Sequence, residues 1–385
     1  MKSKKIKFLL LIPLSLLLAV ASSANDTDLY MASGQGVEAN VLIMFDNSGS
    51  MNEEIQAFFY DPSITYDPLV VPQANRDTVY YRVYGGGWNL FANSISDVAC
   101  SAARTALTNK GHYEGYTNSA CSSRNRTLRT GNYRNYLASI GGSEYLPKLT
   151  IAKRVIEDFL NTIYGVRIGM MVFNYSEGGR IHSTIKTLND TNRNQLINDV
   201  RNITADTWTP LAETLYEAGL YFKGGASHFN SGVVYTSPIQ YYCQRNYVII
   251  ITDGMSTQDR NSILPSAIGD RDGDQREPIG APNDPNYPYN GSDYLDDVAK
   301  YLYDTDLRSD LTNQQNIITY TIGFTEDNDL LERTAIHGHG RYFYSNNAQQ
   351  LADAFQDIVN EILEKSSSFV APLVPVSRME RTCWR

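Results

Sequence analysis

Three short polar strings contain the residues best suited to chemistry. The first is a D-x-S-x-S string directly after an apolar run, and the third is a Thr-Asp-Gly string after another apolar run. The second is a threonine, Thr209, which we expect to be the N-cap of a helix with Pro210 at its first position. Two carboxylates and three hydroxyls form an all-oxygen ligand set, which suits a hard divalent cation that keeps several waters and one open position. The candidate ligands are Asp46, Ser48, Ser50, Thr209 and Asp253.

The positions of these strings favour a common site over separate turns. Serine and aspartate are frequent in turns, so one D-x-S-x-S string alone is weak evidence. Here, however, each string comes at the end of an expected strand or the start of an expected helix. Ligands of open α/β sheets bind at the carboxyl ends of the strands, where such loops converge. We therefore expect one cation site, with Mg²⁺ as the best candidate and Mn²⁺ or Ca²⁺ as alternatives.

The elements that must position this site alternate between strands and helices from residue 39 to residue 364. Continuous apolar runs indicate strands covered on both faces, and apolar residues at helical spacing indicate the helices between them. This order predicts an α/β fold with a doubly wound, mostly parallel sheet. We expect strands at 39–45, 166–173, 180–188 (an antiparallel edge), 247–252, 316–323 and 341–344, and helices at 149–164, 189–203, 211–222, 293–303, 326–335 and 350–363.

A large insertion follows the first strand, at about residues 52–146. It is rich in Tyr, Gly, Asn and Ser, and its tyrosines could form either a binding face or a packed cap. Cys100 and Cys121 flank one of its loops and are the best candidates for a disulfide, the default state of cysteines in an exported protein. The pairing of Cys243 and Cys383 stays open.

The start of the chain has the pattern of a secretory signal peptide at residues 1–24. Four lysines precede an apolar stretch, and small residues follow it. We expect an exported mature chain that begins near Asn25 and has no membrane span. Removing the four lysines takes the formal net charge from −9 to about −13, which argues against nucleic-acid binding because phosphate contacts need clustered Lys and Arg.

The three strings together resemble the metal-ion-dependent adhesion site of von Willebrand factor A domains, over about residues 38–364. Longer strings resemble the N-terminal half of the PilC/PilY family of type IV pilus assembly and tip-adhesin proteins; they begin at Thr209, Tyr294, Thr319 and Lys365. The resemblance implies that the five candidate residues bind the cation and that its open position accepts a partner's carboxylate. It also implies minor pilins, or host or abiotic surfaces, as partners, and roles in attachment, pilus biogenesis and twitching motility. The expected location is the pilus tip or another outer-membrane-associated surface, reached through the periplasm.

Two features depart from that family. Its members continue past a Val-Ala-Pro linker into a β-propeller, whereas here residues 365–385 read as a linker and a short tail, so we expect a truncated chain. In addition, His337 and His339 stand where a plain glycine-rich turn is expected. A turn is favoured there over a site for a soft metal.

A second cation candidate lies in an acidic loop at about residues 255–292. Asp270, Asp272 and Asp274 alternate, Glu277 follows, and alternating carboxylates in a turn can bind Ca²⁺. The loop is not an EF-hand, because its sixth position is Gln275 where glycine is needed and its twelfth is Ala281 where glutamate is needed. The alternative is a solvated acidic loop with several prolines.

The sequence contains no G-x-S-x-G, H-E-x-x-H or G-x-x-x-x-G-K-[ST] motif, so we expect binding without turnover. Three functions stay open: a cation-dependent adhesion module of a type IV pilus, a secreted divalent-metal hydrolase, and a structural assembly factor that needs no exposed metal. The first is favoured, because the ligand set leaves no obvious general base for hydrolysis.

Overall fold

The computed structural model describes residues 37–56, 60–67, 76–82, 86–139, 145–276 and 287–367. The expected signal peptide, Glu277, Cys383 and most of the expected linker lie outside these residues. Within the described part of the chain, no helix combines the length and apolar character needed to cross a bilayer.

The main domain is built on a six-stranded sheet with the order β12-β11-β10-β1-β8-β9. All neighbouring strands are parallel except β8 and β9, which are antiparallel at the edge. This confirms the expected doubly wound, mostly parallel sheet. The strands are β1 (Ala39–Phe45), β8 (Val166–Phe173), β9 (Gly179–Thr187), β10 (Asn246–Thr252), β11 (Ile317–Phe324) and β12 (His339–Ser345).

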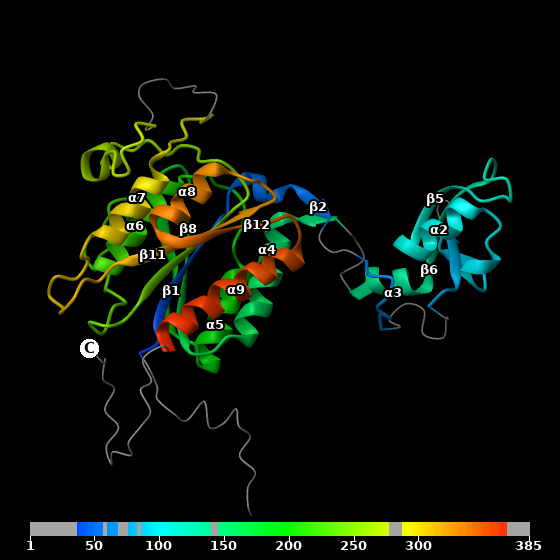
Figure 1. The fold of residues 1–385 in the computed structure, drawn as a ribbon, viewed down its shortest axis with the longest axis horizontal. Helices are drawn as coiled ribbons and strands as arrows, with labels where there is room; N and C mark the ends of the chain where they lie inside the picture. Colours follow the sequence, from blue (N-terminus) through cyan, green and yellow to red (C-terminus); the bar gives the residue numbers. More distant parts are fainter. Residues whose placement is uncertain are drawn as a thin grey trace, which may run out of the picture.

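Helices cover both faces of this sheet, which is why its central strands are apolar along their whole length (Figure 1). On one face, Val41, Ile43 and Phe45 of β1 belong to a core with α4 (Lys148–Thr162), α5 (Asp190–Arg201) and α9 (Ala348–Ser367). On the other face, Leu42 and Met44 belong to a core with α6 (Leu211–Lys223), α7 (Tyr294–Asp304) and α8 (Asp329–His337). Alternate side chains of β1 therefore serve two separate cores.

Helix α9 continues to Ser367, beyond the expected start of the linker at residue 365. Lys365 forms an ion pair with Glu361 one turn earlier, with 2.6 Å between Nζ and Oε1. The Lys365 ammonium also lies over the ring of Tyr320 in β11. These contacts hold the last turn against the sheet, so the helix extends beyond the residues that show the apolar helical spacing.

The insertion has regular structure of its own instead of one long loop. Its entry and exit pair as the antiparallel strands β2 (Glu54–Gln56) and β7 (Tyr145–Pro147). Beyond them lies a four-stranded antiparallel sheet with the order β4-β3-β6-β5, which Figure 1 shows apart from the main sheet. Its elements are β3 (Val79–Arg82), β4 (Trp88–Ala92), α2 (Ser101–Lys110), β5 (His112–Tyr116), β6 (Asn125–Thr130) and α3 (Gly131–Ser139).

A disulfide and a tyrosine cluster hold the insertion together. Cys100 and Cys121 are joined by a disulfide. Cys100 is buried beside Val79 and Leu128, in the small core under this sheet. Separately, Tyr133 and Tyr136 are buried and pack with Tyr60 and Tyr66. These four tyrosines pack as a cap and do not form an exposed binding face.

Candidate metal-ion site at the carboxyl end of the sheet

The two central strands bring the two candidate carboxylates to the same edge of the sheet. Strands β1 and β10 are parallel neighbours, with Phe45 opposite Ile251. The backbone N–H of Asp46 donates to the carbonyl of Ile251 at 3.0 Å, one residue beyond the end of β1. Asp46 and Asp253 therefore leave the sheet side by side although 207 positions separate them in the sequence.

A chain of short hydrogen bonds connects four of the five candidate ligands. Asp46 Oδ1 accepts the backbone N–H of Ser48 at 2.7 Å. The hydroxyl oxygens of Ser48 and Ser50 lie 2.9 Å apart, and Ser50 Oγ donates to Asp253 Oδ1 at 2.7 Å. The structure thus brings Asp46, Ser48, Ser50 and Asp253 together, as the string spacing predicted they could be.

Thr209 lies in a loop that is bound to both of these segments. Its backbone N–H donates to Thr257 Oγ1 at 2.9 Å, and its carbonyl accepts the N–H of Thr257. The preceding Thr207 pairs with Ser48 through a parallel bridge. In the described part of the chain, no hydrogen bond joins the Thr209 hydroxyl to the other four side chains.

The expected role of Thr209 as the N-cap of a helix is wrong. Pro210 occupies the N-cap position of α6, without a side-chain cap. The first free N–H groups of the helix, those of Ala212 and Glu213, both donate to the carboxylate of Asp259 at 2.9 Å. Because Asp259 supplies these acceptors, the Thr209 hydroxyl is not used for capping.

The site carries negative charge that is largely removed from water. Asp46 is fully buried, and this burial, followed by the nearby charge of Asp253, raises the pKa of Asp46 to about 7. Hydrogen bonds from Ser48 and from the Thr252 hydroxyl, the latter at 2.6 Å, offset part of that rise. A cation between these carboxylates would favour their ionised form.

Sequence reasoning missed Lys148, a buried cation that contacts this site. Lys148 Nζ lies 3.0 Å from Asp253 Oδ2 and 2.5 Å from Glu53 Oε2, and its side chain is only 6% exposed. Burial would lower the pKa of Lys148, but the hydrogen bond to Glu53 and the charge of Asp253 raise it overall. The available signal was a lysine directly before the expected helix at 149–164, close to a helix start, where the dipole disfavours a cation.

The residues present fit a hard divalent ion. The donors are carboxylate and hydroxyl oxygens from three loops. In addition, Asp253 Oδ2 is buried, and the ammonium of Lys148 is the charged group that it contacts among the described residues. Ser50 and Gly49 are exposed, so the site is accessible from solvent.

The second expected cation site assembles differently from its sequence pattern. Carboxylate oxygens of Asp270 and Asp272 lie within 4.8 Å of one another and of Asp297, which belongs to α7. Asp274 instead forms an ion pair with Arg276, with 3.3 Å between Oδ2 and Nε. Glu277 lies outside the described residues. The structure thus joins two of the four expected residues to a helix that the pattern did not indicate.

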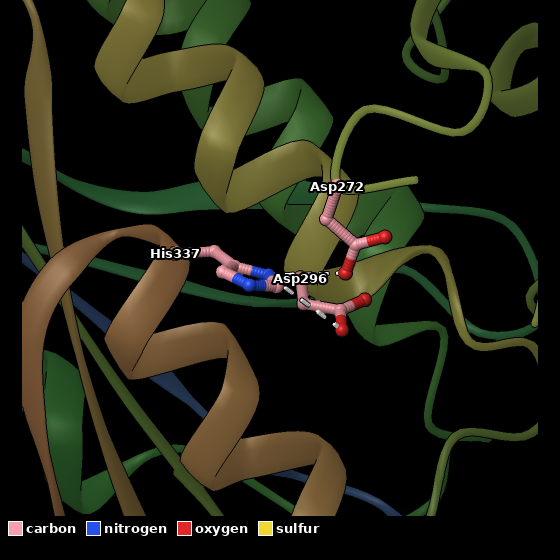
Figure 2. A group of neighbouring side chains, drawn as sticks. All are labelled: Asp272, Asp296 and His337. Atoms are coloured by element: carbon pink, nitrogen blue, oxygen red, sulfur yellow. Dashed lines mark ion pairs between the residues drawn. The ribbon is translucent and has the colours of Figure 1, made fainter. Parts of the chain in front are cut away.

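The two histidines of the expected turn have different surroundings. His339 stacks on the ring of Tyr303, with 3.6 Å between ring centroids. His337 ends α8 and lies with Asp272 and Asp296, another residue of α7 (Figure 2). Burial raises the pKa of Asp296 to about 8, although its hydrogen bond from Arg333 acts in the opposite direction.

No protein-family model matches the chain. Among curated proteins, the type IV pilus biogenesis factor PilY1 of Pseudomonas aeruginosa (strain PAK) is 24% identical over an alignment of 259 residues, which covers 49% of this chain. The chain spans 22% of the length of that relative. The similarity confirms the resemblance to PilC/PilY proteins that the motifs predicted.

Solved structures with similarity to this chain include three bacterial proteins. The von Willebrand factor type A protein from Catenulispora acidiphila is 12% identical, with a TM-score of 0.39, and the match covers 86% of this chain and 42% of that one. The PilB minor pilin from Streptococcus sanguinis is 15% identical, with a TM-score of 0.41 and coverages of 88% and 64%. The von Willebrand factor domain of the type V pili tip protein Mfa5 from Porphyromonas gingivalis is 11% identical, with a TM-score of 0.39 and coverages of 86% and 97%. The von Willebrand factor A-like fold of this chain follows from its strand order and from the position of the site loops at the carboxyl edge.

Proposed function

We propose that this chain is a PilY1-like, pilus-associated protein that binds a partner's carboxylate through a divalent cation at the Asp46 site. The ligands would be Asp46, Ser48, Ser50, Thr209 and Asp253, and Mg²⁺ is the ion that best suits them. The bound ion would supply a positive charge with one coordination position open to an outside acid group. The proposed activity is binding without turnover, in surface attachment and pilus assembly at the cell surface.

The observation that carries this proposal is the hydrogen-bonded chain from Asp46 through Ser48 and Ser50 to Asp253. It brings together oxygen ligands from the segments that follow β1 and β10, including two buried carboxylates. A buried carboxylate that keeps its charge needs a cation or several hydrogen bonds. Lys148 approaches one oxygen of Asp253, and Asp46 has no such ion pair among the described residues.

The surface beside the site suits a protein partner. Trp208, next to Thr209, is exposed and its ring lies 6.0 Å from that of Tyr289, which is also exposed. Tyr175 is exposed too, and its carbonyl accepts the N–H of Trp208. Aromatic side chains of this kind are enriched in protein interfaces. The partner segment whose carboxylate binds the ion could therefore also contact these aromatic side chains.

The test combines ion binding with two cellular readouts. Calorimetry with Mg²⁺ is expected to show one site in the purified chain that is lost in Asp46→Ala and Asp253→Ala. Asp206→Ala is the matched control, because Asp206 is an exposed carboxylate on the neighbouring loop. In cells that produce the two site variants, a normal number of pili with lost surface attachment would indicate a role in adhesion. Loss of the pili themselves would indicate a role in assembly. Unchanged Mg²⁺ binding in both site variants would overturn the proposal.

A further inference from the structure

A second group of metal-binding side chains lies where three segments meet. Asp272 comes from the loop after the helical turn η3 (Leu264–Ile268), Asp296 from the first turn of α7, and His337 from the end of α8. Figure 2 shows the two carboxylates and the imidazole turned toward one another. One ligand atom from each of the three residues lies within 4.8 Å of the other two.

The distances in this group approach those between ligands of one small ion. His337 Nδ1 lies 3.1 Å from Asp272 Oδ2 and 3.9 Å from Asp296 Oδ2. Ligand atoms at about 2.1 Å from a shared ion lie roughly 3.0 to 3.4 Å apart at octahedral or tetrahedral angles. The distance from His337 to Asp272 falls within this range and the distance from His337 to Asp296 is longer, so the side chains would have to move closer together to coordinate one ion.

The facing atoms also lack the hydrogen bonds expected of buried polar groups. Within the described part of the chain, neither Asp272 Oδ2 nor His337 Nδ1 has a hydrogen-bond partner. The Asp272 side chain is only 4% exposed, so water does not readily satisfy that oxygen. The buried oxygen is therefore directed at a position that a cation would satisfy.

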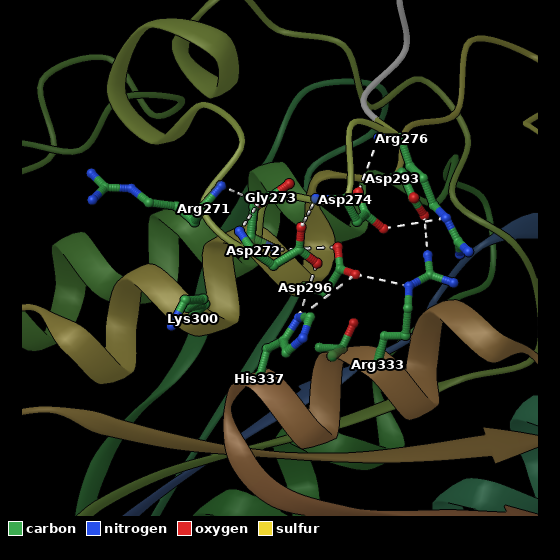
Figure 3. A network of polar contacts seen from close by, with 12 residues as sticks. Arg271, Asp272, Gly273, Asp274, Arg276, Asp293, Asp296, Lys300, Arg333 and His337 are labelled. Carbon is green, nitrogen blue, oxygen red and sulfur yellow. Dashed lines mark hydrogen bonds and ion pairs between the residues drawn. The ribbon is translucent and has the colours of Figure 1, made fainter.

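The surrounding contacts hold the two carboxylate ligands in place. Asp272 Oδ1 accepts the backbone N–H of Asp274 at 3.0 Å, which leaves Oδ2 for a ligand role. Asp297 Oδ1 accepts the N–H groups of Arg271 and Asp272 and so ties the loop to α7. Arg333 Nε donates to Asp296 at 3.0 Å (Figure 3). Hydrogen bonds of this kind orient the ligands of metal sites.

We propose that Asp272, Asp296 and His337 bind a divalent transition-metal ion, best represented by Zn²⁺. One imidazole nitrogen and two carboxylate oxygens are a usual donor set for Zn²⁺, whereas Mg²⁺ and Ca²⁺ prefer oxygen alone. The ion would join the loop at 269–276 to α7 and α8. This site is separate from the Asp46 site and does not depend on the proposed role at the pilus.

Zn²⁺ binding to the whole, untagged chain tests the proposal. The chain is first treated with a chelator, and Mg²⁺ is then kept at ~5 mM, well above a typical micromolar dissociation constant, so that it occupies the all-oxygen site. No reducing agent is used, so that the cysteines of the disulfide supply no thiolate ligands. Calorimetry is expected to give one Zn²⁺ site that weakens at least about tenfold in His337→Gln and in Asp272→Asn. Zn²⁺ should also raise the unfolding temperature of the unmodified chain and not that of His337→Gln.

Two control variants distinguish Zn²⁺ binding at this site from Zn²⁺ binding elsewhere in the chain. His339→Gln removes the neighbouring histidine, and Asp46→Asn alters the Mg²⁺ candidate site; both are expected to keep full Zn²⁺ affinity. Because His337 is 29% exposed at the end of a helix, its Gln variant should fold even if Asp272→Asn does not. Equal Zn²⁺ affinity in His337→Gln and the unmodified chain would overturn the proposal, as would binding of Ca²⁺ or Mg²⁺ that excludes Zn²⁺ there.

Discussion

The ammonium of Lys148 lies 3.0 Å from Asp253 Oδ2, at the edge of the candidate adhesion site. Lys148 begins α4, and its side chain also contacts Glu53 of the segment after Ser50. The contact partly neutralises Asp253 before any ion is bound. Lys148 and a divalent ion would therefore compete electrostatically for the same carboxylate.

Replacement of Lys148 should make stability depend more strongly on Mg²⁺. In Lys148→Met, the buried carboxylate of Asp253 loses its cation, so the free energy of unfolding should fall by about 3 kcal/mol without ions. Added Mg²⁺ should restore a larger share of stability in this variant than in the unmodified chain. Denaturant unfolding with and without Mg²⁺ measures both effects.

Lys153→Met is the matched control for this change. Lys153 lies on the same helix but contacts backbone carbonyls of Arg201 and Ile203, and no carboxylate among the described residues. Its variant should show the same Mg²⁺ response as the unmodified chain. An equal Mg²⁺ response in Lys148→Met would show that Lys148 does not oppose the ion.

Asp46→Asn should separate ion binding from folding. The amide keeps an oxygen for the N–H of Ser48 and can donate to the Thr252 hydroxyl, while one charge of a repelling pair is removed. We expect the free energy of unfolding without ions to change by less than about 1 kcal/mol. Mg²⁺ affinity should fall by more than about 100-fold, since even the loss of a group that only orients a metal ligand costs roughly 10- to 100-fold.

Asp206→Asn again provides the control, now with calorimetry and denaturant unfolding on the purified chain. It should leave both quantities unchanged. A large loss of stability in Asp46→Asn would instead assign Asp46 a structural role that outweighs ion binding.

The sheet, and the meeting of the Asp46 and Asp253 strings at its edge, could be predicted because their sequence signals are local. Apolar runs such as 41–45 and 247–251 indicate buried strands by themselves. Because a polar string directly follows each run, the strand also determines where that string lies. Parallel pairing of β1 and β10 then brings Asp46 and Asp253 together. Local pattern and parallel pairing are therefore sufficient for this part of the site.

The remaining parts depend on contacts between distant segments. Asp259 replaces Thr209 as the acceptor at the start of α6 from 47 positions away, which no capping pattern near residue 209 reveals. Likewise, the alternating aspartates suggested a loop site, but the partners of Asp272 come from α7 and α8. Such groupings follow from tertiary packing, and sequence spacing does not encode them directly.

Loss of the disulfide should loosen the insertion without affecting the ion site. Cys100 and Cys121 close a loop with a sequence separation of 21, for which a bond of this kind contributes about 3 kcal/mol. In the double variant Cys100→Ser, Cys121→Ser, limited proteolysis should cleave within residues 86–139 first. Mg²⁺ affinity should equal that of the unmodified chain, because all five candidate ligands belong to the main domain. A parallel loss of Mg²⁺ binding would show that the insertion supports the site.

The buried pair Glu213 and Asp259 should make stability fall as pH rises from about 4.5 to 8. Burial, followed by the charge of Asp259, raises the pKa of Glu213 to about 8, and burial also raises the pKa of Asp259. A folded state that holds a proton which the unfolded chain has released loses stability with increasing pH. This contribution is complete below the unfolded pKa of Glu213 and lost as pH passes the folded value. One proton corresponds to a slope of about 1.4 kcal/mol per pH unit.

Glu213→Gln isolates this contribution. Its side chain keeps one acceptor for the backbone N–H groups of Gly178 and Asn261, so we expect a cost of about 1 kcal/mol at pH 5. Between pH 5 and pH 8, the free energy of unfolding measured with denaturant and a chelator should fall less steeply than in the unmodified chain. The difference in slope should approach one proton, because other buried carboxylates such as Asp296 titrate in both proteins. Parallel pH profiles would mean that Glu213 is ionised in the folded protein, and that its backbone hydrogen bonds outweigh both burial and the repulsion from Asp259.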